Sequence, residues 1–121
     1  TIESYKINYD FKIMNFTICN ELSNEAQLLA FPSFWGRLFE YNLPLTIQTN
    51  QCESFSIMPK CRGGLVGGNL TYIVDQDNTM NVVIGPGMII NETSGSVNCV
   101  ITGFYKGEGD SNDPSVTCTI G

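Results

Sequence analysis

Apolar and polar residues alternate along most of this 121-residue chain. A β-strand points successive side chains to opposite faces, so an alternation with a period of two predicts strands that bury one face. About nine short segments show this pattern, and turn-forming sequences rich in Gly, Asn, Asp and Pro separate them. The segments are 5–9, 11–18, 43–49, 55–58, 70–74, 80–84, 87–90, 97–105 and 116–120.

Strands at this spacing, without helices between them, predict an all-β fold: one antiparallel β-sandwich domain over residues 1–121. A chain of this length supports one hydrophobic core, because two cores would each be too small to offset the loss of chain entropy. One segment also has helical character. Ser23 could cap a short helix over 24–29, which Pro32 would end, and a strand is an equal alternative there.

The five cysteines are Cys19, Cys52, Cys61, Cys99 and Cys118. None lies in a Cys-x-x-Cys pair, so we expect disulfides rather than a zinc site, and hence a secreted, extracellular protein. Buried free thiols are the alternative. The short interval between Cys52 and Cys61 favours a local bridge, which would leave Cys19 unpaired or bonded to another chain.

The C-terminal hairpin allows the sharpest disulfide prediction. Folding the chain back about the loop 106–114 sets Cys99 opposite Cys118. Neighbours on one apolar face of two paired strands can be bridged where their Cβ atoms come closest. The same register pairs Val97 with Ile120 and Ile101 with Val116.

Three Asn-x-Thr sequons, at Asn15, Asn69 and Asn91, are consistent with a secreted glycoprotein. Chance gives about two such triplets in a chain so rich in Asn, Ser and Thr, so the cysteines support secretion better. The sequence shows no signal-peptide pattern at Thr1, and we expect a secreted form to have lost its leader. No apolar run approaches the length of a membrane-spanning helix.

The chain has no histidine and a net charge of −6. Without an imidazole, Ser-His and Cys-His nucleophile pairs and His-ligated metal sites are excluded, so we expect a protein that binds a ligand and is not an enzyme. The negative charge repels phosphate backbones, so nucleic acid is not an expected partner. Capture by an anionic membrane is disfavoured for the same reason.

Carboxylates are the remaining candidates for chemistry. Asp75 and Asp77 lie in one turn-like segment, and Glu108, Asp110 and Asp113 lie in another. Oxygen atoms clustered on loops could hold calcium weakly, and calcium is the one cofactor considered. A carboxylate pair could also cleave a glycosidic bond, but no apolar flank is present to raise one pKa. The simplest interpretation is that these residues form turns.

Two segments are candidate ligand-binding surfaces. Aromatic residues concentrate in one stretch, where Trp35, Arg37 and Tyr41 could anchor at a membrane interface or stack on sugar rings. Lys60 and Arg62 form the only basic pair, beside a Gly-rich loop whose backbone amides could grip a phosphate or sulfate. Burial of the aromatic residues in the core and a simple hairpin loop at the glycines are the structural alternatives.

Three motifs together resemble the aegerolysins, small all-β proteins of fungi and bacteria. They are the strand 11–16, the Trp-Gly-basic-Leu segment 35–38, and the segment 61–75, where Cys-Arg-Gly-Gly precedes a strand with an acidic end. The similarity, which extends loosely over residues 7–85, implies a β-sandwich that recognises membrane lipid, often sphingolipid–sterol mixtures, with a second protein that forms the pore. Trp35 is the only tryptophan, so that family's Trp-rich second half has no counterpart here. The family's order Cys-Gly-Arg is also changed to Cys-Arg-Gly.

These features predict a secreted, non-enzymatic binding protein that recognises membrane lipid or another cell-surface ligand. The first alternative is an interaction or effector protein, or a self-associating surface protein, because a spare cysteine and unpaired sheet edges favour a partner protein or a second copy. The second is a lectin-like carbohydrate-binding module, since aromatic rings stack on sugars. A hydrolase that uses carboxylates alone ranks last.

Overall fold

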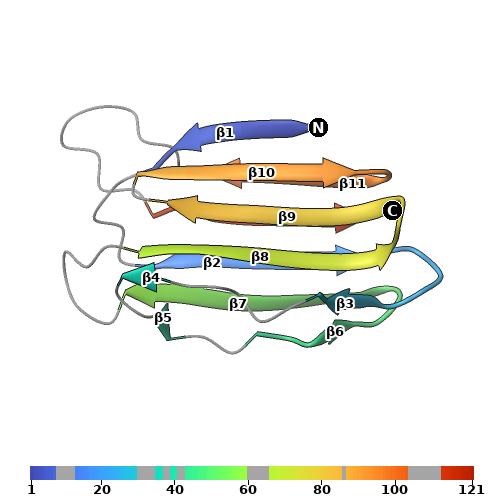
Figure 1. The fold of residues 1–121 in the computed structure, drawn as a ribbon. Helices are drawn as coiled ribbons and strands as arrows, with labels where there is room; N and C mark the ends of the chain where they lie inside the picture. Colours follow the sequence, from blue (N-terminus) through green and yellow to red (C-terminus); the bar gives the residue numbers. More distant parts are fainter. Residues whose placement is uncertain are drawn as a thin grey trace.

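Two β-sheets face each other in the computed structural model of the protein, which is an all-β sandwich (Figure 1). The described part of the chain contains no helix, and therefore none that is long and apolar enough to cross a membrane. The helix considered after Ser23 is wrong, because Ala26–Leu28 is a strand. The residues that the structure describes are 1–7, 13–29, 35–36, 39–40, 43–59, 66–85, 87–103 and 113–121.

The larger sheet contains seven strands, and all of their pairings are antiparallel. They are β1 (Ile2–Lys6), β3 (Ala26–Leu28), β4 (Trp35–Gly36), β6 (Thr46–Ile47), β8 (Val66–Asp75), β9 (Asn78–Gly85) and β10 (Met88–Ser94). Their order is β1-β10-β9-β8-β3-β6, and β4 also pairs with β8. The central strands β8, β9 and β10 form two hairpins in succession, so the middle of this sheet is built from local contacts.

The smaller sheet contains five strands in the order β11-β12-β2-β7-β5. They are β2 (Met14–Asn20), β5 (Phe39–Glu40), β7 (Gln51–Pro59), β11 (Val97–Thr102) and β12 (Ser115–Ile120). One pairing departs from the antiparallel prediction, because β12 runs parallel to β2. In this register Val116 lies beside Phe16 and Cys118 beside Ile18, so both strands turn their buried residues to the same face.

The C-terminal hairpin has the predicted register. Cys99 lies opposite Cys118, and the two form a disulfide with a Cα–Cα distance of 4.0 Å. Both side chains lie inside the sandwich. The predicted bridge is confirmed. The register was predictable because a slip of one residue would turn every buried side chain of the strand to solvent. The flanking pairs are Val97–Ile120 and Ile101–Val116.

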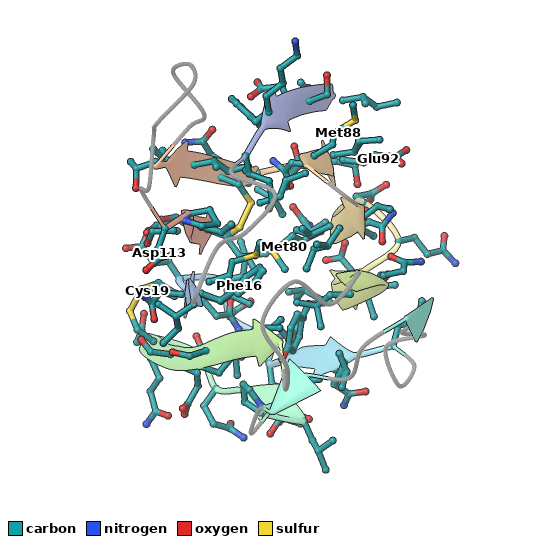
Figure 2. The ribbon with its side chains drawn as sticks, turned by 90° about the vertical axis from the view of Figure 1, so that its left-hand side faces the viewer. Phe16, Cys19, Met80, Met88, Glu92 and Asp113 are labelled. Atoms are coloured by element: carbon teal, nitrogen blue, oxygen red, sulfur yellow. A yellow bond between two sulfur atoms is a disulfide. The ribbon has the colours of Figure 1, made fainter. Side chains whose placement is uncertain are left out.

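The core lies between the sheets and consists almost wholly of apolar side chains. Phe16 of β2 stacks on Phe55 of β7, with ring centroids 4.9 Å apart and an interplanar angle of 3°. Figure 2 shows Phe16 and Met80, which come from different sheets, between the two layers. Alternate residues of each long strand supply this core, as the two-residue period predicts. The largest fully buried side chains are Tyr72, Phe16, Met14, Ile18, Ile47, Ile57, Leu70, Met80, Ile84, Ile89, Ile120 and Val82.

Asn20 is a buried polar residue at the end of β2. Its Nδ2 donates hydrogen bonds to the carbonyl oxygens of Asn24, at 2.8 Å, and Ile47, at 3.0 Å. Its Oδ1 accepts one from the backbone N–H of Leu22, at 3.0 Å. These three bonds hold the connection that follows β2 against β6, so Asn20 determines how the chain leaves the smaller sheet.

We expect Asn20→Ala to lower the free energy of unfolding by about 2 to 4 kcal/mol, because it leaves two carbonyls and one N–H without their partner. Urea unfolding followed by tryptophan fluorescence measures the change. Asn98→Ala is the matched control, since Asn98 is exposed on β11, and it should cost less than about 0.5 kcal/mol. Equal losses in the two variants would contradict the role of Asn20.

Among the described residues, Tyr72 is the largest fully buried side chain. Its hydroxyl donates a hydrogen bond to the carbonyl oxygen of Pro44, at 2.7 Å. Burial, and to a lesser extent the negative charge of Glu53, raises the pKa of Tyr72 far above its usual range. The folded protein therefore keeps this phenol neutral in conditions where the unfolded chain ionises it.

This pKa difference predicts a loss of stability in alkali. The unfolded phenol ionises near a pH of about 10, so stabilisation by the neutral form is complete below that pH and declines as the pH rises above it. We expect Tyr72→Phe to be less stable at neutral pH, because it loses the bond to Pro44, but to decline less steeply above a pH of about 10. Urea unfolding at a series of pH values measures this, and equal slopes would contradict it.

Candidate functional site

One end of the sandwich brings two short strands against the strands on either side of the basic loop. The backbone of Trp35 in β4 pairs with Gly67 at the start of β8, which belongs to the larger sheet. The backbone of Phe39 in β5 pairs with Pro59 at the end of β7, which belongs to the smaller sheet. Figure 1 shows β4 and β5 at the left-hand end, where β7 ends and β8 begins. The aromatic segment thus reaches both sheets at one end.

The candidate ligand-binding residues lie in these paired strands or shortly after them in the sequence. In the sequence, Arg37 follows β4, Tyr41 follows β5 and Lys60 follows β7. Arg62 comes two residues after Lys60. These four residues lie outside the described part of the chain, and for Trp35 the backbone alone is described. Of the predicted set, the structure therefore places the backbone of Trp35 alone, and the set stays a prediction.

A second candidate site surrounds a disulfide at the other end of β7. Cys19 of β2 and Cys52 of β7 lie opposite each other and form a bridge with a Cα–Cα distance of 3.9 Å. Both occupy the outer face of the smaller sheet, where Cys52 is exposed and Cys19 is half-buried. Figure 2 shows Cys19 on the outer side of its layer, away from the core residue Phe16.

The predicted bridge between Cys52 and Cys61 is wrong. Cys52 lies near the start of β7, and the extended strand carries the chain roughly 23 Å from it by Pro59. Cys52 is bonded to Cys19, so its sulfur has no bond left for Cys61. Cys61, rather than Cys19, is therefore outside both bridges, and it also lies outside the described residues. The sequence did contain a signal, because Cys19 and Cys52 both occupy the polar face of an alternating strand.

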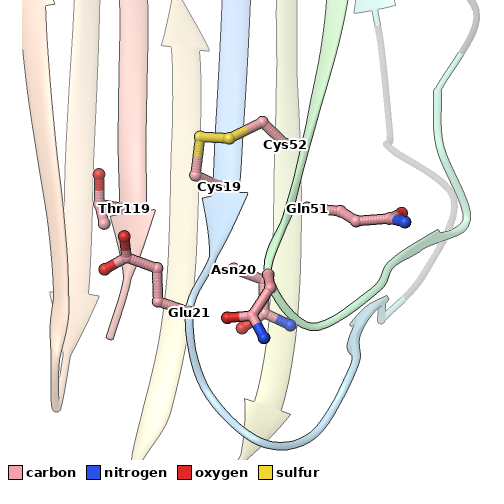
Figure 3. A pocket seen from close by; sticks show the side chains of 7 residues that line it. Cys19, Asn20, Glu21, Gln51, Cys52 and Thr119 are labelled. Carbon is pink, nitrogen blue, oxygen red and sulfur yellow. A yellow bond between two sulfur atoms is a disulfide. The ribbon is translucent and has the colours of Figure 1, made fainter.

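A partly open groove of about 250 Å³ lies beside the Cys19–Cys52 disulfide (Figure 3). Thr119 contributes to it because the parallel strand β12 places this residue next to Cys19. Asn50, in the turn before β7, has a φ of 60°, a conformation that Asn tolerates better than most residues. Glu21 is the only acidic or basic residue of the lining. The groove therefore combines a disulfide, hydrogen-bonding groups and one negative charge.

The two candidate calcium ligands lie in the turn between β8 and β9. Oδ1 of Asp75 accepts hydrogen bonds from the backbone N–H of Asp77, at 2.8 Å, and of Asn78, at 3.0 Å. The side-chain amide of Asn78 donates to both carboxylate oxygens of Asp75. These hydrogen bonds lower the pKa of Asp75, and the bonds from the side-chain amide of Asn78 have the largest effect. The carboxylate stabilises the turn, and among the described residues no group of three or more His, Cys, Asp and Glu side chains could hold a metal.

The three sequons differ in accessibility. Asn15 and Asn69 are exposed, and Asn15 accepts a hydrogen bond from the Ser56 hydroxyl at 2.8 Å. Asn91 on β10 is only 4% exposed, and its Oδ1 has no hydrogen-bond partner in the structure described. A glycan attached at Asn91 would have to pass through the packed interior. The burial of Asn91 thus disfavours a glycan there in the folded domain, and the use of the three sequons stays a prediction.

Folded protein from a eukaryotic secretory host should carry no glycan at Asn91, because the buried amide has no room for one. Glycopeptide mass spectrometry measures the occupancy of each site. Asn91→Gln should leave the glycan mass unchanged. Asn69→Gln is the matched variant, because it should remove a glycan from protein in which this exposed site is glycosylated. A glycan on Asn91 in folded material would contradict the burial.

Neither the protein-family models nor the curated proteins compared with the chain match it. The class of protein is therefore given by the structure alone: it is a β-sandwich with two disulfides. The likeness to aegerolysins stays a hypothesis that depends on the three short motifs.

Proposed function

We propose that the protein is a secreted, non-enzymatic binding protein that recognises membrane lipid or another cell-surface ligand. The ligand would bind at the end where β4 and β5 meet β8 and β7. The supporting observation is the backbone pairing of Trp35 with Gly67 and of Phe39 with Pro59. It brings the aromatic segment to the two strands that flank Lys60 and the rest of the basic loop.

The two disulfides support an extracellular location, since disulfides persist in oxidising compartments and are reduced in the cytosol. One bridge joins β2 to β7 and the other joins β11 to β12. Together they crosslink four of the five strands of the smaller sheet. A crosslinked sheet is a rigid support, and a rigid support lowers the entropy that a binding surface loses when it meets its ligand.

Binding is favoured over catalysis by the chemistry of the side chains. The chain has no histidine to act as a general base near neutral pH. Hydrogen bonds from its own turn lower the pKa of Asp75, whereas a general acid needs a raised pKa. Asp75 therefore lacks the raised pKa that a general acid would need.

The ligand would be neutral or zwitterionic at its surface. The net charge of −6 opposes approach to an anionic membrane. Aromatic side chains such as Trp35 suit the level of the lipid headgroups, where one end of the ring is apolar and the other meets water. Sphingomyelin with sterol fits this description and is also the surface that the aegerolysin resemblance implies.

We expect the protein to sediment with vesicles of sphingomyelin and cholesterol, and Trp35→Ala to reduce the bound fraction. Loss of an aromatic anchor should weaken binding roughly tenfold, which corresponds to about 1.4 kcal/mol. Val100→Ala is the control, because Val100 is 54% exposed on β11 and is not part of the proposed site. Unchanged sedimentation of Trp35→Ala, with its fold verified by circular dichroism, would contradict the proposal.

Contact with a partner protein or a second copy is the second candidate. In the described structure β1 and β11 each lie at the edge of a sheet, with no strand on their outer side. Edge strands present unpaired N–H and C=O groups to another chain. Ile2 of β1 is 67% exposed, so an apolar side chain is available at this edge. A sedimentation coefficient that rises with protein concentration would favour this candidate over lipid recognition.

A further inference from the structure

The two disulfides differ in how exposed their cysteine residues are. Cys99 and Cys118 are 7% and 0% exposed within the sandwich. Cys19 and Cys52 lie on the outer face of the same sheet, and Cys52 is exposed. A thiolate breaks a disulfide by direct attack on one of its sulfur atoms, so access decides which bridge reacts.

The groove beside the outer disulfide offers a small molecule a place from which to attack (Figure 3). Its volume of about 250 Å³ is below that of pockets for drug-sized ligands. The disulfide is part of its wall, and the polar residues Asn50, Gln51 and Thr119 also line it. The size and lining suit a thiol of a few non-hydrogen atoms that carries one polar group.

We propose that Cys19–Cys52 is a thiol–disulfide exchange site for low-molecular-weight thiols, whereas Cys99–Cys118 is an inert structural bridge. In the first step a thiolate attacks Sγ of Cys52, the more exposed cysteine, and forms a mixed disulfide. The bond between the two cysteines breaks, and Sγ of Cys19 leaves with the electron pair and takes a proton from water.

In the second step another thiolate attacks the small molecule's sulfur in the mixed disulfide. The low-molecular-weight disulfide is released, and Sγ of Cys52 leaves with the electron pair and is protonated. Two thiols are thus oxidised to one disulfide, while the protein disulfide is reduced to two thiols. In the presence of a low-molecular-weight disulfide in excess, the same steps run in reverse.

The smaller sheet has the contacts to remain folded without this bridge. β2 and β7 pair over seven residues, from Met14–Asn20 on one strand to Gln51–Ile57 on the other. The stacked rings of Phe16 and Phe55 join the same two strands on the core side. Exchange therefore exposes two surface thiols and leaves the sandwich intact.

Glu21 gives the site a preference among thiols. Its carboxylate is the only charged group in the groove lining while the disulfide is closed. At short range it repels a thiolate that carries a second negative charge and attracts one that carries an ammonium group. Cysteamine should therefore react faster than thioglycolate when the two are compared at equal thiolate concentration.

The experiment uses the whole protein under native conditions, with free thiols first blocked by iodoacetamide. Cysteamine is then added, new thiols are trapped with N-ethylmaleimide, and the modified cysteines are identified by mass spectrometry. We expect trapping at Cys19 and Cys52 at least roughly tenfold faster than at Cys99 and Cys118, with an unchanged circular dichroism spectrum. Equal rates for the two bridges, or reduction of Cys19–Cys52 only in urea, would overturn the proposal.

A variant isolates the effect of charge. Glu21→Gln should lower the ratio of the cysteamine rate to the thioglycolate rate by roughly two- to fivefold, since the intrinsic reactivity of each thiol cancels in the comparison. Glu92→Gln, at an exposed position of β10 in the other sheet, should leave the ratio unchanged. An unchanged ratio in Glu21→Gln would show that the preference for cationic thiols is wrong.

Discussion

The burial of one face of β2 supports much of this structure. β2 lies between β12 and β7 in the smaller sheet, and its inner residues are fully buried against the larger sheet. Phe16 stacks on Phe55 of β7, and Asn20 ties the end of the strand to β6. Because side chains alternate along a strand, the burial of Phe16 and Ile18 turns Cys19 outward. The core and the surface chemistry therefore have a common origin in this strand.

The two bridges illustrate how one sheet can give the same bond two different environments. Cys118 and Cys19 lie on the adjacent strands β12 and β2, one register position apart, and so point to opposite faces. The inner bridge is enclosed by the core, which water and thiols do not enter. The outer bridge borders a groove with one carboxylate, that of Glu21. The face of the sheet on which each disulfide lies therefore decides whether a small molecule can reach it.

The proposed binding end depends on a different feature, the crossing of the chain between the sheets. β7 belongs to the smaller sheet and β8 to the larger, and the earlier strands β5 and β4 pair with β7 and β8 respectively. β4, β5, the end of β7 and the start of β8 all lie at one end of the sandwich (Figure 1). The outer disulfide lies near the other end of β7, at Cys52. The proposed ligand-binding end and the proposed thiol-exchange site are thus separate parts of one scaffold.

The sequence by itself determined most of the long strands, the face on which most of their residues lie, and the bridge between Cys99 and Cys118. Those features are local, because a two-residue period sets the face and a hairpin has one register that buries its apolar side. Only the tertiary structure decided that Cys19 meets Cys52 across 33 residues, that β12 runs parallel to β2, and that Asn91 is buried. Alternation says which way a side chain points, but not which strand lies beside it. Non-local pairing depends on how all the strands bury their apolar faces together, and no single segment contains that information.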